Sequence, residues 1–331
     1  MPLDKVAVLL FMPEKAINNS PFRPVFIFGC RRSGTTLLRS MLEQHPELLV
    51  HPKEPQFILT LLSHFGFTLH HKQKAIIELI QHPYLPENID REALATFLAD
   101  SNIQTWPDLI RAYLAYWRKD AEAHRQIVLK DPAFTFHLPS LDQLFPEARY
   151  IHVVRHPYGN VSSQRARWQD ASVWECAVWW KDAVTIGHRL AQAQPERCLE
   201  VEYRALVLNP EESLQQVCQF LEIPFTEKLL DFTLETISFS PEEPPEAKRF
   251  TGLDPERLER WRKYLTPMDI RLVEHCCKQE MRWWDYEILK PTVDEQAFRQ
   301  RLWQERVHYM LLRGARFVKQ KVRQLKYRVN L

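Results

Sequence analysis

The feature that most constrains this chain is a short loop bounded by two glycines, Gly29 and Gly34. The apolar run Val25–Phe28 before it is typical of a buried strand, and the residues after it follow helical spacing. Thr35 and Thr36 add hydroxyl groups where that helix would begin. In a strand–loop–helix context, the spacing G-x-x-x-x-G indicates a phosphate-binding loop whose backbone N–H groups point at an anion. A turn that uses glycine without binding anything is the weaker alternative.

The loop lacks the lysine that follows the second glycine in nucleotide triphosphatases, because Thr35 stands at that position. Arg32, inside the loop, supplies the positive charge instead. A grip on β- and γ-phosphates with Mg²⁺ is therefore disfavoured. We expect a 5′-phosphate carrying one further group, held by Arg32, Ser33, Gly34, Thr35 and Thr36.

Other short apolar runs alternate with helical patterns along the chain, which favours a parallel sheet covered by helices on both faces. The expected strands after the loop are Leu48–His51, Ile127–Lys130, Tyr150–Val154 and Cys198–Glu202. The expected helices are 36–44, the proline-interrupted region 57–122, 157–168, 173–193 and 210–221. From residue 226 onward we expect helices, broken by a proline-rich loop at 241–245. The fold class is thus α/β, a P-loop-type parallel sheet flanked by helices with a helical C-terminal extension.

The charge distribution separates the C-terminal segment from the rest of the chain. Over the whole chain, the 44 Lys and Arg nearly balance the 42 Asp and Glu. Residues 299–331, however, contain ten Lys and Arg and one acidic residue, a net charge of +9, so residues 1–298 have a net charge of −7. We divide the chain into an α/β domain, 1–290, and a basic amphipathic helical extension, 291–331. The extension has three interpretations: contact with an anionic membrane surface, packing on its own domain, or contact with a second subunit. We favour packing, and the balanced total charge gives no reason to expect a nucleic-acid partner.

Composition indicates a reduced protein without a metal site. The six cysteines form no C-x-x-C pair and have no His at zinc spacing. The apolar run Val6–Met12 lacks a basic segment and a cleavage site, and no stretch approaches the roughly 18 apolar residues of a membrane span. We expect a cytoplasmic location, with peripheral membrane contact through the basic helix as the alternative to it. Four tryptophans are expected in the core, with a stacking wall as the alternative: Trp168, Trp174, Trp179 and Trp180.

A second anion signal follows the strand at residues 150–154. Arg155 stands at its carboxyl end, and Ser163 comes eight residues later in the next helix. A guanidinium group and a hydroxyl in these places can meet one phosphate. Arg167, one helical turn after Ser163, is on the same helix face and is either a further phosphate contact or an exposed arginine.

Residues 24–57, with Arg-Ser-Gly-Thr-Thr-Leu-Leu at 32–38 followed by His45-Pro46, resemble the loop of sulfotransferases that use 3′-phosphoadenosine 5′-phosphosulfate (PAPS). The resemblance extends over roughly residues 24–222 and is strongest to the bacterial and protein-tyrosine branch. It implies that the loop holds the 5′-phosphosulfate and that Arg155 and Ser163 hold the 3′-phosphate. His156 departs from the family's usual Asp. Tyr203 matches the family's Y-x-x-L-x-x-x-P stretch, which implies nucleotide contact, with a core tyrosine as the alternative.

The resemblance also implies roles in transfer. Lys130 resembles the lysine that assists the leaving 5′-phosphate, and Arg32 would offset charge on the sulfuryl group. Pro132 stands where members acting on small phenols have a histidine base. Glu54 resembles the glutamate base of the tyrosylprotein branch, although its spacing from His-Pro differs; His51 and His152 are the alternatives.

The sequence therefore predicts a PAPS-dependent sulfotransferase that acts by direct in-line transfer, without a metal, on an acceptor hydroxyl or amine. Two other functions stay open at this point: a P-loop nucleotide kinase or NTPase, and a non-catalytic nucleotide-binding protein. The acceptor is not readable, because acceptor pockets are built from variable loops.

Overall fold

The structure is a computed structural model that describes residues 23–66, 69, 71–118, 125–168, 170–235 and 249–329. The chain forms two compact units. Unit 1 comprises residues up to 25, 46–129 and 138–149, and unit 2 comprises 26–45, 130–137 and 150–331. The predicted domain boundary near residue 290 rests on the charge and helical pattern of the C-terminal segment, and it stays a prediction.

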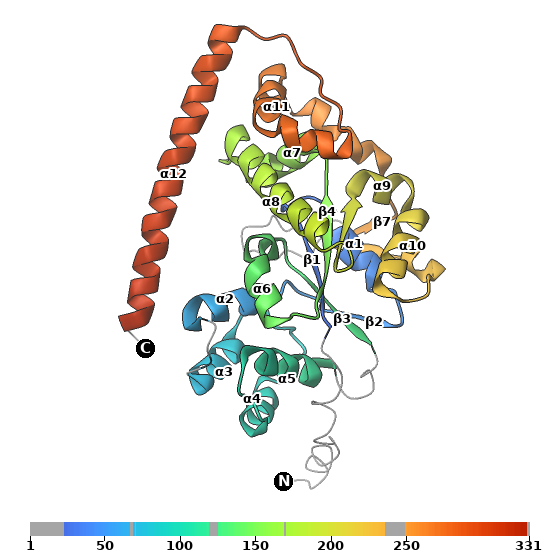
Figure 1. The fold of residues 1–331 in the computed structure, drawn as a ribbon, viewed down its shortest axis with the longest axis vertical. Coiled ribbons are helices and arrows are strands. Elements are labelled where there is room, and N and C mark those ends of the chain that lie inside the picture. The colour runs from blue at the N-terminus through green and yellow to red at the C-terminus, as the bar shows by residue number, and fades with distance from the viewer. Residues whose placement is uncertain are drawn as a thin grey trace. The chain divides into compact units, whose positions relative to one another are not determined.

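A five-stranded sheet has the strand order β2-β3-β1-β4-β5 (Figure 1). Its strands are β1 Val25–Phe28, β2 Leu48–Val50, β3 Gln126–Lys130, β4 Arg149–Val154 and β5 Cys198–Glu202. β2 pairs with β3 in parallel, and β4 pairs with β5 in parallel, with Tyr150 opposite Cys198. The side chains of β1 are buried on both faces, as its continuous apolar sequence predicts. The predicted P-loop-type α/β fold is confirmed.

Unit 1 adds helices to β2 and β3. They are α2 Gln56–Phe65, α3 Lys72–Gln81, α4 Arg91–Asp100, α5 Trp106–Arg118 and α6 Leu138–Leu144. Helix α4 begins at Asp90, whose carboxylate accepts hydrogen bonds from the N–H groups of Glu92 and Ala93 and so satisfies two free donors of the first turn.

Unit 2 contains the remaining helices. They are α1 Thr35–Leu42, α7 Pro157–Arg167, α8 Val173–Ala193, α9 Tyr203–Leu208, α10 Pro210–Leu221, α11 Pro267–Met281 and α12 Glu295–Val329. Short 3-10 turns join them: η3 Pro132–His137, η4 Glu227–Leu230, η5 Pro255–Leu258, η6 Arg260–Lys263 and η7 Arg282–Trp284. Caps define several boundaries; the Ser172 hydroxyl, for example, accepts from Glu175 N–H at the start of α8.

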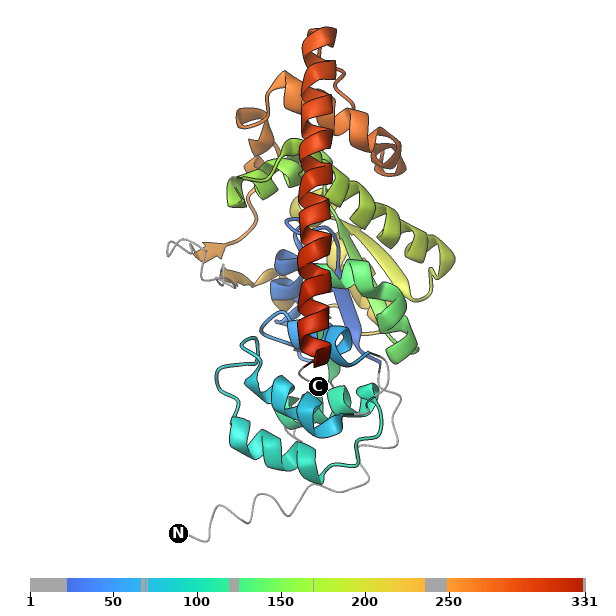
Figure 2. The same ribbon diagram turned by 90° about the vertical axis from the view of Figure 1, so that its left-hand side faces the viewer.

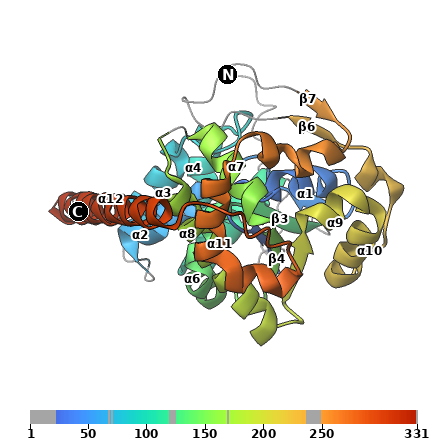
Figure 3. The ribbon, with the colours of Figure 1, turned by 90° about the horizontal axis from the view of Figure 1, so that it is seen from above.

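The helices of unit 2 lie on both sides of β4 and β5. Seen from above, α7, α8 and α11 gather on one side of β4, and α9 and α10 lie on the other (Figure 3). The first group encloses a buried cluster that includes Tyr158, Trp180, Val273 and Met281. Tyr158 Oη donates to Glu274 Oε1 at 2.7 Å, so the polar atom of this core ring is satisfied.

The C-terminal part of unit 2 differs from the sequence prediction at one point. The region after residue 226 was expected to be helical, but Thr233–Glu235 (β6) and Arg249–Thr251 (β7) pair as antiparallel strands. Three-residue strands are too short to show a period of two, so sequence periodicity misses them. The proline-rich loop 241–245 and the run Val6–Met12 lie outside the described residues.

Among the described residues, no helix is long and apolar enough to cross a membrane. All six cysteines are free and buried.

Candidate functional site

Four strand ends of the sheet supply the candidate site, all with residues of unit 2. The glycine loop follows β1, Lys130 ends β3, Arg155 follows β4, and Tyr203 follows β5. The Asp131 N–H donates to the Ile27 carbonyl at 3.2 Å, which holds the end of β3 beside β1. Ligands of open parallel sheets bind at the carboxyl ends of strands, so this edge is where a nucleotide is expected.

The loop after β1 needs both of its glycines. Gly29 has φ +147° and Gly34 has φ +101°, and an added Cβ would overlap the Val153 carbonyl at the first position and the Tyr203 ring at the second. Gly34 is also the N-cap of α1. Arg32, between them, has φ +68°, a conformation that non-glycine residues adopt only when surrounding contacts impose it. The loop is therefore shaped by close approach to β4 and to Tyr203.

Gly34→Ala tests this shape, with Gly252→Ala as the matched control. Gly252 also has positive φ (+84°), but no atom lies within 4 Å of an added Cβ. Backbone strain alone costs about 1–3 kcal/mol and is common to both variants. We expect Gly34→Ala to lower the melting temperature several degrees further than Gly252→Ala, because only the first displaces a ring. Equal losses in thermal unfolding would show that the loop does not depend on the Tyr203 contact.

Asn160 of α7 forms hydrogen bonds with two residues of the loop. Its Nδ2 donates to the Arg31 carbonyl at 2.9 Å and to Ser33 Oγ at 3.0 Å. Ser33 and Asn160 are fully buried, so the Ser33 hydroxyl braces the loop. Burial raises the pKa of the Cys30 thiol to about 12, which keeps this loop residue neutral.

Arg31 fixes the outer side of the loop. Its Nε donates to Gln164 Oε1 at 2.8 Å, and its guanidinium lies between the rings of Trp168 and Trp179, 4.3 and 4.5 Å from their centroids. These two tryptophans thus sandwich a loop arginine, whereas Trp180 is buried in the core and Trp174 packs against it. The expectation of core packing is confirmed for Trp174 and Trp180 and is wrong for Trp168 and Trp179.

Arg155 is a half-buried cation beside the loop. Its Nη1 donates to the Arg32 carbonyl at 3.1 Å, and its guanidinium lies 4.5 Å from the centroid of the Tyr203 ring. Within the part of the chain that the structure describes, it forms no ion pair with a carboxylate. Burial and the positive charges of Arg32 and Arg257 lower its pKa. An anionic ligand would stabilise the charged form of Arg155, because two other positive charges lie close to it.

Arg32 brings the two anion signals together. Its carbonyl accepts from Arg155, and its Nε donates to Ser163 Oγ at 3.2 Å. The glycine loop, the end of β4 and helix α7 therefore meet at one residue. Arg167 lies further along α7, with its guanidinium 5.9 Å from the Trp168 ring centroid, and no described contact joins it to Arg155 or Ser163.

His156, at the place of the family's usual Asp, caps helix α7. Its Nδ1 accepts from Tyr158 N–H at 3.3 Å, which requires that nitrogen to be unprotonated. Burial lowers the pKa of His156 to about 4, so the ring is neutral at physiological pH. A neutral cap adds no negative charge next to Arg155.

Lys130 is 2% exposed at the end of β3, and its Nζ donates to Thr36 Oγ1 at 3.2 Å. The ammonium is thus directed at the first turn of α1, where the helix N-terminus favours anions. Asp131 Oδ1 accepts from Ala133 N–H at 2.8 Å, so Asp131 caps the turn that follows Lys130.

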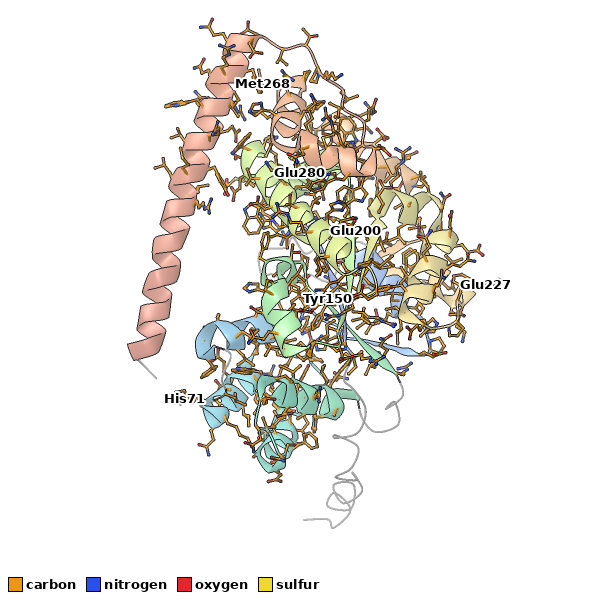
Figure 4. The ribbon with its side chains drawn as sticks, in the orientation of Figure 1. His71, Tyr150, Glu200, Glu227, Met268 and Glu280 are labelled. Carbon is orange, nitrogen blue, oxygen red and sulfur yellow. The ribbon has the colours of Figure 1, made fainter. Side chains whose placement is uncertain are left out.

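Glu54 belongs to unit 1, where it precedes α2 and is half-buried, with Oε2 3.5 Å from Gln56 Nε2. The two alternative bases are engaged elsewhere. The ring nitrogens of His51 lie 2.6 Å from Lys53 O and 2.8 Å from Tyr113 Oη. His152 is fully buried, and its Nδ1 lies 2.9 Å from an oxygen of Glu200, which is labelled in Figure 4. Both histidines are structural.

Sequence reasoning missed two residues of the site. Arg257, on η5, has its carbonyl 3.5 Å from Arg155 Nη2, and its side chain pairs with Asp254 at 3.1 Å. Asn160 is the second. Neither stands in a motif, and Arg257 is 102 residues from its partner, so only the folded chain brings them to the loop.

Comparison with known proteins agrees with this arrangement. Residues 24–227 match the model of the sulfotransferase family. The protein-tyrosine sulfotransferase of Drosophila melanogaster is 29% identical over 214 residues, covering 62% of this chain and 39% of that protein. Protein-tyrosine sulfotransferase 1 of Danio rerio is 26% identical, with 65% and 57% covered. The chain thus spans about half the length of these curated relatives.

Two solved structures share the fold. A sulfotransferase domain from the Synechococcus PCC 7002 olefin synthase is 25% identical, with a TM-score of 0.53, and covers 77% of this chain and 94% of that one. A sulfotransferase domain from the curacin biosynthetic pathway is 21% identical, with a TM-score of 0.57, and covers 81% and 100%. The second likeness concerns the fold alone.

Proposed function

Because the chain belongs to the sulfotransferase family, we propose that it transfers the sulfuryl group of PAPS to an acceptor hydroxyl. The observation that carries this proposal is the contact between Arg155 and the loop carbonyl of Arg32. It joins a half-buried cation without a carboxylate partner among the described residues to a glycine loop that could hold an anion. A nucleotide with phosphate on both sides of its ribose suits two adjacent anion sites.

The 5′ side would be held by the loop and the start of α1. Gly34 leaves the backbone N–H groups of the helix N-terminus open, and Thr35 and Thr36 follow it. Ser33 would contribute by holding the loop in shape, because its hydroxyl accepts from Asn160 and its N–H donates to the Cys30 carbonyl at 3.1 Å. The 3′ side would be held by Arg155 and Ser163, with Arg167 as a further contact from α7. The Tyr203 ring lies 4.5 Å from the Arg155 guanidinium and packs directly against Gly34, so it would help to position Arg155 beside the loop.

PAPS, when bound, supplies an activated sulfuryl group. Glu54 would take the proton of the acceptor hydroxyl as its oxygen forms the new bond to sulfur. The bond from sulfur to the 5′-phosphate oxygen breaks at the same time, and Lys130 would stabilise the negative charge left on that oxygen. Arg32 would offset charge on the sulfuryl oxygens. The acceptor leaves with the sulfuryl group, and adenosine 3′,5′-bisphosphate remains.

The nucleotide kinase alternative fits the loop less well. Thr35 replaces the lysine that such enzymes place on the β- and γ-phosphates. The kinase alternative also gives no role to Arg155, the second cationic site beside the loop. The non-catalytic alternative predicts that replacing Lys130 or Glu54 changes stability alone.

Thermal unfolding with two nucleotides tests the proposal. At about 100 times its Kd, a ligand that binds only the folded state adds about 2.7 kcal/mol of stability. We expect adenosine 3′,5′-bisphosphate to raise the melting temperature by several degrees and ATP with Mg²⁺ to raise it far less at the same concentration. The reverse order would support the kinase alternative and contradict the proposal.

A further inference from the structure

Helix α12 packs on its own unit through the face that carries Phe298, Leu302 and Glu305. Phe298 is 4% exposed and belongs to the buried cluster of unit 2, and Leu302 packs against the same cluster. Glu305 is 6% exposed, accepts from Trp174 N–H at 3.3 Å and pairs with Arg301 at 2.8 Å. These positions follow the spacing of four and three that marks one helix face. The expectation that the extension packs on its own domain therefore holds for this face.

A second apolar stripe lies on the opposite face of α12. Trp303, Met310 and Leu311 are 67%, 62% and 70% exposed, and Val307 lies between them in sequence. At 100° per residue, these positions are turned roughly 120–220° from Phe298. Three of the eight large apolar side chains exposed in the described residues thus fall within nine residues of one helix. Scattered exposed apolar residues are ordinary, but a stripe of this kind indicates a surface that binds something.

Helix α12 runs to Val329 as one rod (Figures 1 and 2). The spacing of three and four recurs at Val318, Val322, Leu325 and Val329. Between residues 306 and 329 there are eight Lys and Arg and no Asp or Glu. An apolar stripe on a strongly cationic helix is the pattern of helices that lie in a membrane interface.

We propose that the stripe of Trp303, Val307, Met310 and Leu311 binds an anionic lipid surface, with α12 lying in the plane of that surface. The apolar side chains would enter the boundary between headgroups and acyl chains, and the cations would meet the lipid headgroup charges. An anionic leaflet attracts each Lys or Arg that lies near it, so a segment of net charge +9 has a strong electrostatic complement there. Two copies joined through this stripe would instead bring two +9 segments together, which repel.

Vesicle flotation tests the proposal with the full chain. We expect binding to phosphatidylcholine vesicles that contain phosphatidylserine, little binding to phosphatidylcholine alone, and a steep fall with added salt. The double variant Met310→Gln, Leu311→Gln should weaken binding about tenfold or more, because it removes the apolar insertion. Ile77→Gln is the matched control: Ile77 is 53% exposed on α3, and its replacement should leave binding unchanged.

Three results would overturn the proposal. The first is equal binding to both vesicle types, and the second is equal binding by the double variant and the parent chain. The third is a concentration-dependent dimer in analytical ultracentrifugation that the double variant abolishes, which would assign the stripe to a second copy. All substituted residues are exposed, so folding of each variant, checked by thermal unfolding, should be nearly unchanged.

Discussion

Replacing Arg155 with alanine is expected to weaken the binding of adenosine 3′,5′-bisphosphate by about 100-fold or more, while adenosine 5′-phosphate binding changes by less than about threefold. The reason is the position of the guanidinium. It is half-buried, it lies close to the positive charges of Arg32 and Arg257, and no described carboxylate pairs with it, so a 3′-phosphate would be its main counter-charge. Calorimetric titration of the two nucleotides measures both affinities.

Arg165→Ala is the control for this experiment. Arg165 is on the same helix as Ser163 but pairs with Asp269 at 3.8 Å and is partly exposed, so its loss should affect neither nucleotide. Arg155→Lys keeps the charge and should retain part of the selectivity. If Arg155→Ala lowered both affinities equally, the residue would hold the loop through the Arg32 carbonyl, and the assignment of the 3′-phosphate to it would be wrong.

Lys130→Met should lower turnover by about 100- to 1,000-fold while the affinity for adenosine 3′,5′-bisphosphate changes by only a few fold. Lys130 is buried with its Nζ on Thr36, at the start of the helix proposed to receive the 5′-phosphate. The charge that it would stabilise develops on the leaving oxygen during transfer. Methionine retains the apolar stem, so folding should persist, and single-turnover measurement with labelled PAPS separates chemistry from binding. Turnover equal to that of the parent would show that Lys130 takes no part in the transfer.

Glu54→Gln tests whether Glu54 takes the proton of the acceptor hydroxyl. Glutamine has nearly the shape of glutamate but cannot accept a proton, so turnover should fall by about 100-fold or more with unchanged nucleotide affinity. Because the structure engages His51 and His152 in buried contacts, neither is expected to replace the carboxylate. Unchanged turnover would place the base elsewhere in the chain.

Elements with strong periodicity and clear end signals were predictable. The helices at 173–193 and 210–221 and the strand at 198–202 have the predicted limits in the structure. The Ser172 cap and Pro210 in the first turn act locally to set where the two helices begin. Strands β6 and β7 were not predictable. Each has three residues, and what makes them strands is their pairing with each other across the chain.

The site shows the same division between local and distant causes. The glycine loop could be predicted from its place between a strand and a helix. Arg155 and Ser163 could be predicted from the resemblance to the sulfotransferase family, in which an arginine follows a strand and a serine comes eight residues later. Their meeting at Arg32 could not be predicted, because it depends on the left-handed backbone of Arg32. That backbone is held by contacts from two helices: Asn160 of α7 donates to the Arg31 carbonyl, and Trp179 of α8 packs on the Arg31 guanidinium. Arg257 reaches Arg155 from η5, which no local pattern connects to β4.

The most direct test of the account is a crystal structure of the chain with adenosine 3′,5′-bisphosphate. The account predicts one nucleotide with its 5′-phosphate on the backbone of residues 34–36 and its 3′-phosphate on Arg155 and Ser163. A nucleotide whose 3′-phosphate faces solvent, or whose 5′-phosphate lies away from the loop, would contradict it.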